Sequence, residues 1–180
     1  ALIGPIAALP IYEMSRRQEA GLDTDWRSAL GVLRSPAMPS IIAVGIFLMA
    51  LFTVWLMVAQ FLYEQLFGIG SPPDLAAFIA QVSQTPEGMQ LMVWGNLIGL
   101  GFAAVALASS VISIPMLIDR DCGAAIAVMT SLRATLRNPV IIAAWGVLVA
   151  ALLALGSLPF LVGLAIVVPV LGHATWHLYR

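Results

Sequence analysis

Ionisable side chains are scarce in this chain. Only 9% of its 180 residues are charged, 61% are hydrophobic, and the mean hydropathy is +1.00. A soluble domain carries about 25% charged residues, because its surface must face water. The composition therefore excludes a water-soluble globular protein and indicates a chain that faces the lipid bilayer.

Lysine is absent, cysteine occurs once, and the net charge is only -1. Without a basic excess, the chain has no electrostatic basis for binding nucleic acid. The single cysteine, Cys122, excludes an internal disulfide and a metal site built from cysteine alone. Phosphate-binding glycine loops, zinc-protease motifs and plausible Ser-His-Asp patterns are also missing, so the motifs predict neither catalytic activity nor a resident cofactor.

Long stretches without charge are the main feature that is present. A helix needs about 20 apolar residues to cross about 30 Å of hydrocarbon. These stretches predict complete spans near residues 40–63, 89–117, 139–156 and 159–178, with a tight turn at residues 156–159 between the last two. Residues 1–12 have the composition of a partial span, so we interpret residues 1–180 as one transmembrane domain that is incomplete at its N-terminus.

Two local sequence signals predict the structure of the connection between the first two complete spans. The segment Ser71-Pro72-Pro73-Asp74 precedes apolar residues at helical spacing, which predicts a short amphipathic helix along the membrane surface. Thr85 followed by Pro86 is typical of an N-cap and the first helical position, and predicts the start of the next span.

The arginines indicate the orientation, because basic residues near span ends stay on the cytoplasmic side. All eight fall in the first connection, in the third connection or at the C-terminus, whereas residues 64–87 carry only acidic charges. We therefore expect the arginine-rich connections and the C-terminus to be cytoplasmic.

Two parts of the chain repeat one order of features: an apolar segment with proline, a charged cluster, an amphipathic helix, Leu-Arg-small-Pro and another span. The predicted amphipathic helices cover residues 26–33 and 125–136, and each should lie in the membrane interface. Because both copies return to the same side, the repeat would be parallel. The expected fold is an all-α, polytopic transmembrane helix bundle with a parallel duplicated helical hairpin and interfacial amphipathic helices.

The residues Tyr12-Glu13-Met14-Ser15-Arg16-Arg17, Leu33-Arg34-Ser35-Pro36, Asp119-Arg120-Asp121 and the ending from Gly172 to Arg180 resemble a bacterial family of integral inner-membrane proteins. This resemblance covers nearly the whole chain. It implies a bacterial inner-membrane location and carries no assigned activity, although some relatives have labels that link them to respiratory oxidases.

His173 and His177 are the sharpest chemical candidates, because a spacing of four residues places two imidazoles on one helical face. Such a pair could bind a haem or another cofactor. The alternative is a structural role where the last span meets the headgroups, since aromatic residues concentrate there.

Two further sets of residues are candidates for structural sites. An interfacial charge cluster is expected from residues that flank the predicted spans: Glu13, Arg16, Arg17, Asp119, Arg120, Asp121 and Arg137. We expect the parts of this cluster from the two copies to meet and to lock the cytoplasmic helix ends together. A strip of small residues favours close helix packing, and its members with the neighbouring amide are Gly95, Asn96, Gly99 and Gly101. Asn96 and Gln60 should face other helices, because an unpaired amide is costly in hydrocarbon.

These features favour a non-catalytic accessory, assembly or scaffold subunit of a larger inner-membrane complex, with other membrane subunits as partners and a respiratory or other electron-transfer complex as one setting. The alternative is a small-solute transporter or channel, which the duplication and the prolines near spans would suit. Against transport, the charged residues avoid the middle of every predicted span.

Overall fold

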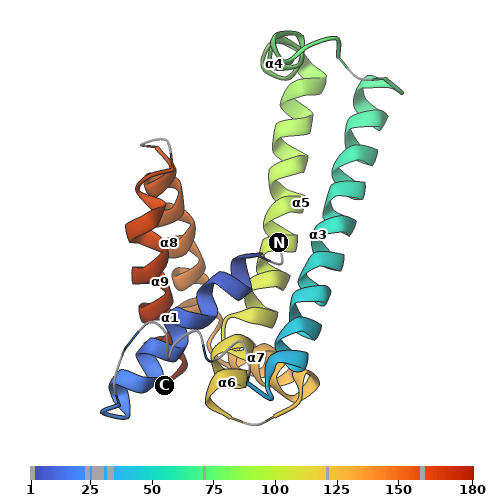
Figure 1. The fold of residues 1–180 in the computed structure, drawn as a ribbon. Helices are drawn as coiled ribbons and strands as arrows, with labels where there is room; N and C mark the ends of the chain where they lie inside the picture. Colours follow the sequence, from blue (N-terminus) through green and yellow to red (C-terminus); the bar gives the residue numbers. More distant parts are fainter. Residues whose placement is uncertain are drawn as a thin grey trace. The chain divides into compact units, whose positions relative to one another are not determined.

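The computed structural model describes residues 3–22, 25, 31, 35–70, 72–120, 122–158 and 161–180, with side chains from Leu9 onward. Among these residues every regular element is helical, which confirms the all-α prediction (Figure 1). The helices, in chain order, are α1 (Ile3–Glu19), α3 (Met38–Phe67), α4 (Leu75–Gln84), α5 (Pro86–Ser110), α6 (Ser113–Asp119), α7 (Ala124–Arg137), α8 (Pro139–Ser157) and α9 (Leu164–Tyr179).

Three stretches of the described chain are long and apolar enough to cross a membrane: Met38–Phe67, Pro86–Asp119 and Pro139–Ser157. They coincide with three of the predicted spans, and the protein is therefore a multi-pass integral membrane protein. Helix α9 is apolar but has only 16 residues. A crossing by α9, and the partial span at residues 1–12, stay predictions.

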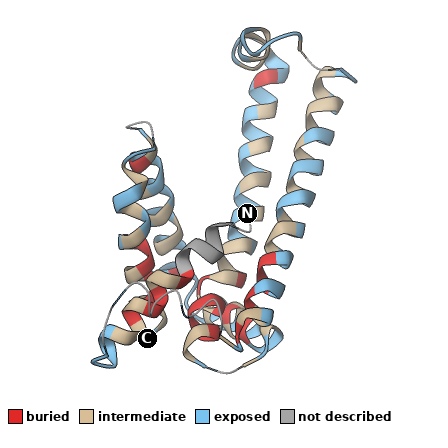
Figure 2. Ribbon diagram, in the orientation of Figure 1, coloured by how far each residue is buried: buried red, intermediate tan, exposed pale blue. Residues whose placement is uncertain are grey.

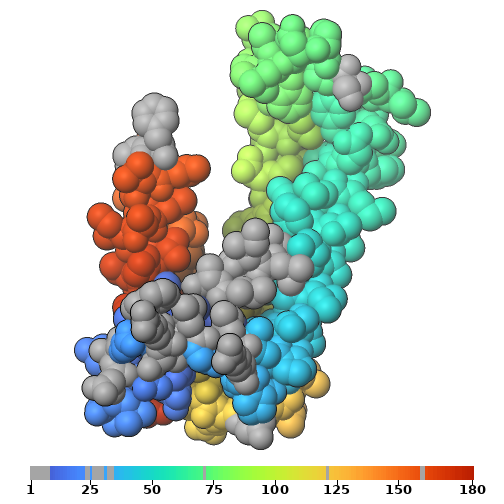
Figure 3. Space-filling model, in the orientation of Figure 1, coloured from blue at the N-terminus to red at the C-terminus, as the bar shows by residue number. Residues whose placement is uncertain are grey.

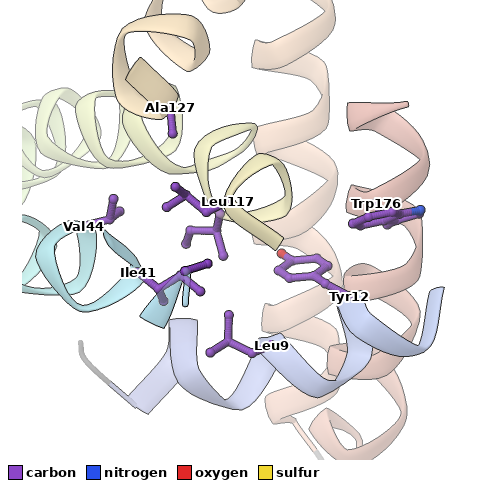
Figure 4. Close-up of a cluster of buried hydrophobic side chains, with 9 residues drawn as sticks. Leu9, Tyr12, Ile41, Val44, Leu117, Ala127 and Trp176 are labelled. Carbon is purple, nitrogen blue, oxygen red and sulfur yellow. The ribbon is translucent and has the colours of Figure 1, made fainter. Parts of the chain in front are cut away.

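The chain forms two compact units, residues 1–49 together with 106–180, and residues 50–105. The first unit contains a core of buried apolar side chains (Figures 2 and 4). Its members come from α1, α3, α6, α7 and α9 and from the residue just before α3: Leu9, Tyr12, Ala37, Ile41, Val44, Ile114, Leu117, Ala127 and Trp176. Trp176 and Leu9 are completely buried, so α1 and α9 are anchored in this core.

The second unit is a helical hairpin of α3, α4 and α5 (Figure 3), in which Trp55 of α3 approaches Gly99 of α5, its Nε1 lying 3.5 Å from where a Cβ atom on that glycine would stand. Asp74 caps α4 by accepting a hydrogen bond from the Ala77 N–H at 2.7 Å, which confirms the predicted helix start. The Tyr63 hydroxyl donates to Gln81 at 3.1 Å, and its ring packs on Phe78. These contacts hold α4 against the end of α3.

The step from α4 to α5 is sharp, and its geometry requires glycine. Thr85 ends α4 and also caps α5, because its Oγ1 accepts a hydrogen bond from the Gly88 N–H at 3.0 Å. A Cβ atom on Gly88 would overlap the carbonyl oxygen of Val82. The predicted start of this span at Thr85-Pro86 is confirmed.

The second predicted span is not one continuous helix, because the α-helix is interrupted at Val111 and Ile112 between α5 and α6. Ser131 of α7, which is fully buried, stabilises this break. Its Oγ donates to the Ala108 carbonyl at 2.7 Å and accepts from the Ile112 N–H at 3.2 Å. One hydroxyl thus pairs two backbone groups that the interruption would otherwise leave without helical partners.

Helix α7 confirms the predicted helix at residues 125–136. It packs through small residues, since Ala127 and Ser131 are buried, whereas Met129 and Leu136 of its apolar stripe are 49% and 80% exposed. An exposed apolar stripe is what an interfacial helix would present to lipid. The helix expected at residues 26–33 falls mostly on residues outside the described ranges, so the duplication and the interfacial placement of both helices remain predictions.

Candidate functional site: a polar network between α1, α6 and α9

Helices α1 and α9 pack closely because a glycine lies at their contact. A Cβ atom on Gly172 would come within 2.6 Å of Ile11 Cγ2. Ser15 lies one helical turn after Ile11, and His173 is the residue next to Gly172. Ser15 Oγ lies 2.5 Å from His173 Nδ1, and Ser15 also donates to the Ile11 carbonyl at 3.0 Å. The absence of a side chain at position 172 thus brings the polar faces of the two helices together.

A second polar contact follows one turn after the first. His177 Nδ1 lies 3.4 Å from Glu19 Oε1. Ser15 and Glu19 are four residues apart on α1, and His173 and His177 are four residues apart on α9, so along this contact the two helices run in the same direction and make polar contacts one turn apart. The histidine spacing singled out in the sequence therefore matches the spacing of two partners on α1.

Glu13 is the most buried charged residue of the network, with 6% of its surface exposed. Its two carboxylate oxygens accept hydrogen bonds from Arg16 at 2.8 and 2.7 Å, and Arg17 lies 3.7 Å away. A buried carboxylate requires such pairing, because desolvation penalises an isolated charge. The hydrogen bonds to Glu13 raise the pKa of Arg16, and Glu13 and Asp119 add Coulombic attraction, while partial burial acts in the opposite direction.

The end of α9 joins α1 to α6. Arg180 lies 3.2 Å from a carboxylate oxygen of Glu19 on α1 and 3.6 Å from one of Asp119 on α6. The Tyr179 hydroxyl donates to Asp119 at 2.7 Å. Arg180 therefore bridges an acidic residue of α1 and one of α6, while a meeting of the charge clusters of two repeated copies remains a prediction.

The surroundings of Tyr179 change the pKa of its phenol. Burial raises the pKa of its phenol to about 12, the hydrogen bond to Asp119 and the charge of that carboxylate add to the shift, and Arg120 opposes it. The protonated phenol is thus favoured, which keeps its hydrogen bond to Asp119 in place at physiological pH.

The predicted charge cluster is assembled only in part. Glu13, Arg16, Arg17 and Asp119 lie in the network, and Arg120 lies 3.8 Å from Asp119 with most of its side chain exposed. Arg137 is exposed and makes no ion pair with a described residue. Asp121 lies outside the described residues.

For the histidine pair, the structure supplies protein partners at Nδ1 of both rings. Among the described residues, no group of three or more His, Cys, Asp or Glu side chains is placed to hold a metal ion. Binding of a haem or another cofactor through the Nε2 atoms stays a prediction, and a visible absorption spectrum of the purified protein tests it.

The small-residue strip on α5 contributes less to packing inside the chain than its motif indicates. At Gly99 a Cβ atom would meet Trp55 Nε1 at 3.5 Å, an ordinary contact, whereas at Gly95 and Gly101 it would meet nothing within 4 Å. Asn96 is exposed and donates to the Met92 carbonyl of its own helix at 2.7 Å. Packing of Gly95, Asn96 and Gly101 against another helix therefore remains a prediction.

Sequence reasoning missed four members of the network, namely Ser15, Glu19, Tyr179 and Arg180. One signal was available, because the spacing of Ser15 and Glu19 equals that of the two histidines. Spacing alone does not say which helices are neighbours, so the pairing of α1 with α9 came only from the fold. Chemically, the network can hold three helix ends together, since its acidic groups face arginine, histidine or tyrosine.

The chain belongs to the family described as predicted integral membrane protein DUF2189, whose profile matches residues 1–119. This confirms the resemblance to a membrane family, over a shorter part of the chain than expected. Comparison with curated proteins and with solved structures found no match. The matched region ends at Asp119, so the network joins this region to α9 beyond it.

Proposed function

We propose that this protein is a non-catalytic accessory, assembly or scaffold subunit of a larger membrane complex. We further propose that this membrane is the inner membrane. The arginine-rich ends of the helices, which carry the polar network, then lie on its cytoplasmic side. The orientation rests on the distribution of basic residues, which are retained on the cytoplasmic side.

One observation carries the proposal: Asn96 is exposed within an apolar stretch of α5. Its neighbours Val93, Leu97 and Leu100 are 52%, 54% and 68% exposed. The hydrogen bond to Met92 uses one amide N–H. The carboxamide has a second N–H and a carbonyl oxygen, which hydrocarbon cannot pair and a polar side chain on a neighbouring subunit can.

Two other observations favour a non-catalytic accessory role over a catalytic role. In an apolar 18-residue stretch of each of the three long spans, only 11–22% of the residues are buried within the chain, so large apolar faces are open to lipid or to other subunits. The ionisable groups of the network pair with one another at one end of the helices, away from the middle of any long span. This arrangement holds the ends of α1, α6 and α9 together.

The test is gentle extraction from native membranes followed by native electrophoresis and identification of co-migrating proteins. We expect a complex that contains other subunits, and we expect Asn96→Leu to weaken it. Leu97→Val, a change at a neighbouring exposed position that adds no polar group, should leave the complex intact. Recovery of this chain without any other protein would overturn the proposal.

The same variants separate this role from the alternative of a small-solute transporter or channel. A transporter reconstituted alone in vesicles would show flux that Asn96→Leu reduces, with no other protein required. An accessory subunit shows no flux alone, and the variant affects only the association.

A further inference from the structure

Helix α7 is tied at both ends to membrane spans. Residues 120–123 separate it from the span that ends at Asp119, and Asn138 alone separates it from the span that begins at Pro139. At about 3.5 Å per extended residue, these two links reach no more than about 18 Å and about 7 Å. Both ends of α7 are therefore held near the depth at which the spans leave the hydrocarbon, which is the depth of the lipid headgroups.

The surface of α7 divides into three sectors, at about 100° per residue. Ala127 and Ser131 are buried and form the sector that faces the core of the first unit. An apolar sector is centred roughly 150° around the helix from them, and its members are Ala125, Met129, Leu132 and Leu136. Arg133 and Arg137 lie together in the third sector, roughly 90° beyond the apolar one. The arginines therefore face neither the core nor the side that the apolar residues occupy.

These two arginines lack a counter-charge. Both are exposed, and neither makes an ion pair or a hydrogen bond with a described residue. They are four residues apart on one helix, so their positive charges are neighbours and repel each other. The sequence has no acidic residue between Cys122 and Arg180. An anion that binds both guanidinium groups would relieve this repulsion.

No carboxylate of the described helices is available to fill that position. Those of α1 and α6 pair within the polar network, namely Glu13, Glu19 and Asp119. Glu64 lies about 30 Å of helix beyond Val44, which shares the buried core with α7. Glu87 lies about 31 Å of helix before Ala108, whose carbonyl binds Ser131 of α7. The hairpin therefore carries its glutamates far from α7.

A phospholipid headgroup is the anion that the depth and chemistry of this sector fit. Guanidinium groups bind phosphate oxygens in bidentate fashion, and the neighbouring apolar sector suits acyl chains. A zwitterionic headgroup brings its own cation, whereas an anionic headgroup leaves a net negative charge for the two arginines. We propose that Arg133 and Arg137 form a binding site for the headgroup phosphate of an anionic phospholipid.

The first test measures which lipid lies beside the arginines. The full chain, with a fluorophore on Thr130→Cys in a Cys122→Ser background, is reconstituted in phosphatidylcholine vesicles. Position 130 lies within about 60° of both arginines around the helix. We expect phosphatidylglycerol that carries a short-range quencher to reach half-maximal quenching at a several-fold lower fraction than phosphatidylcholine with the same quencher. Equal fractions for the two lipids would overturn the proposal.

Two double variants separate the arginines from the rest of the helix. A basic residue near an anionic surface contributes enough that Arg133→Gln with Arg137→Gln should raise the half-maximal fraction of phosphatidylglycerol about 5- to 30-fold. Arg133→Lys with Arg137→Lys keeps both charges and should retain most of the preference. An unchanged fraction in the glutamine variant would contradict the assignment of these two residues.

Inorganic phosphate distinguishes a lipid site from a site for a soluble anion. Added to the phosphatidylglycerol vesicles at constant ionic strength, millimolar phosphate should leave the quenching unchanged, because the lipid is confined to the surface that contains the site. Relief of the quenching would assign the arginines to a soluble ligand and would overturn the lipid site.

A second measurement tests the depth of α7 independently of any arginine variant. Spin labels are placed at Leu136→Cys, a position that is 80% exposed in the apolar sector, and at Thr130→Cys. We expect the label at 136 to collide more with oxygen dissolved in hydrocarbon, and the label at 130 to collide more with a water-soluble nickel chelate. Equal collision with the chelate at both positions would place the apolar sector in water and exclude the site.

The lipid site does not depend on the proposed function, since it needs only the bilayer. Co-purification that fails while the quenching preference is found removes only the accessory role. Co-purification without a preference for phosphatidylglycerol removes only the lipid site.

Discussion

The hydroxyl of Ser131 gives the sharpest test of the fold, because one atom serves two backbone groups at the break between α5 and α6. Ser131→Ala removes the bond to the Ala108 carbonyl and the bond from the Ile112 N–H. A buried polar group left unpaired costs about 1–3 kcal/mol, so the substitution should destabilise the protein by about 2–6 kcal/mol. This is a large share of a total stability that is about 5–15 kcal/mol in soluble domains.

Thr130→Ala is the matched control for this prediction. Thr130 is the adjacent residue, and its Oγ1 donates to the Ile126 carbonyl of the same helix at 2.8 Å. Because that carbonyl lies within α7 and the hydrogen bond is exposed to solvent, Thr130→Ala should lower the free energy of unfolding by no more than about 0.5 kcal/mol. Equilibrium unfolding in mild detergent measures both variants. A Ser131→Ala variant as stable as Thr130→Ala would refute the assignment of Ser131 as the residue that holds the break.

Two further predictions concern the contact of α9 with its neighbours. Gly172→Ala should destabilise the protein by about 1–3 kcal/mol, because the new methyl group overpacks the contact with Ile11, and thermal unfolding in detergent measures the loss. For Tyr179, the folded-state pKa of about 12 lies above the usual value near 10, so its stabilisation is fully present below about pH 10 and is lost as the pH rises from 10 to 12. Thermal unfolding of the wild type and Tyr179→Phe across this range should show a steeper loss in the wild type.

Each of these predictions has its own control. Ile11→Ala added to Gly172→Ala removes the clashing Cγ2 atom, so the double variant should lose less stability than the sum of the single variants. If the losses of stability from Ile11→Ala and Gly172→Ala add fully in the double variant, overlap with Ile11 is not the cause of the destabilisation by Gly172→Ala. The chain has no lysine, whose ionisation would otherwise occur in the same pH range, and the comparison of wild type with Tyr179→Phe removes the contribution of the other two tyrosines. Parallel plots of thermal stability against pH for the wild type and Tyr179→Phe would contradict the raised pKa of Tyr179.

The spans and helix starts could be predicted because they depend on local properties. Charges are expelled from hydrocarbon, so Glu64, Glu87 and Asp119 mark the ends of long apolar spans within a few residues. Asp74 and Thr85 cap helices through bonds to backbone atoms three residues away, which needs no knowledge of other elements. Local chemistry was therefore sufficient for most of the secondary structure.

The candidate site could be predicted only as a set of charged residues at helix ends. Its pairings depend on which helices are neighbours, and an amphipathic pattern does not specify that. Arg180 bridges Glu19 and Asp119 across 161 and 61 positions of sequence, and no local spacing encodes such contacts. Likewise the break before α6 is stabilised by Ser131, whose sequence context is that of an ordinary helical serine.

The unequal lengths of the helices have a consequence for the surrounding lipid. At about 1.5 Å per residue, the 30 residues of α3 extend about 45 Å, whereas the 16 residues of α9 extend about 24 Å. Where α9 crosses the membrane, as the sequence predicts, a hydrocarbon layer of about 30 Å matches neither length, so tilting of the long helix and local thinning beside the short one are the available adjustments. Membrane thickness should therefore act on this protein as a physical variable, with thinner bilayers favouring α9 and thicker bilayers favouring α3.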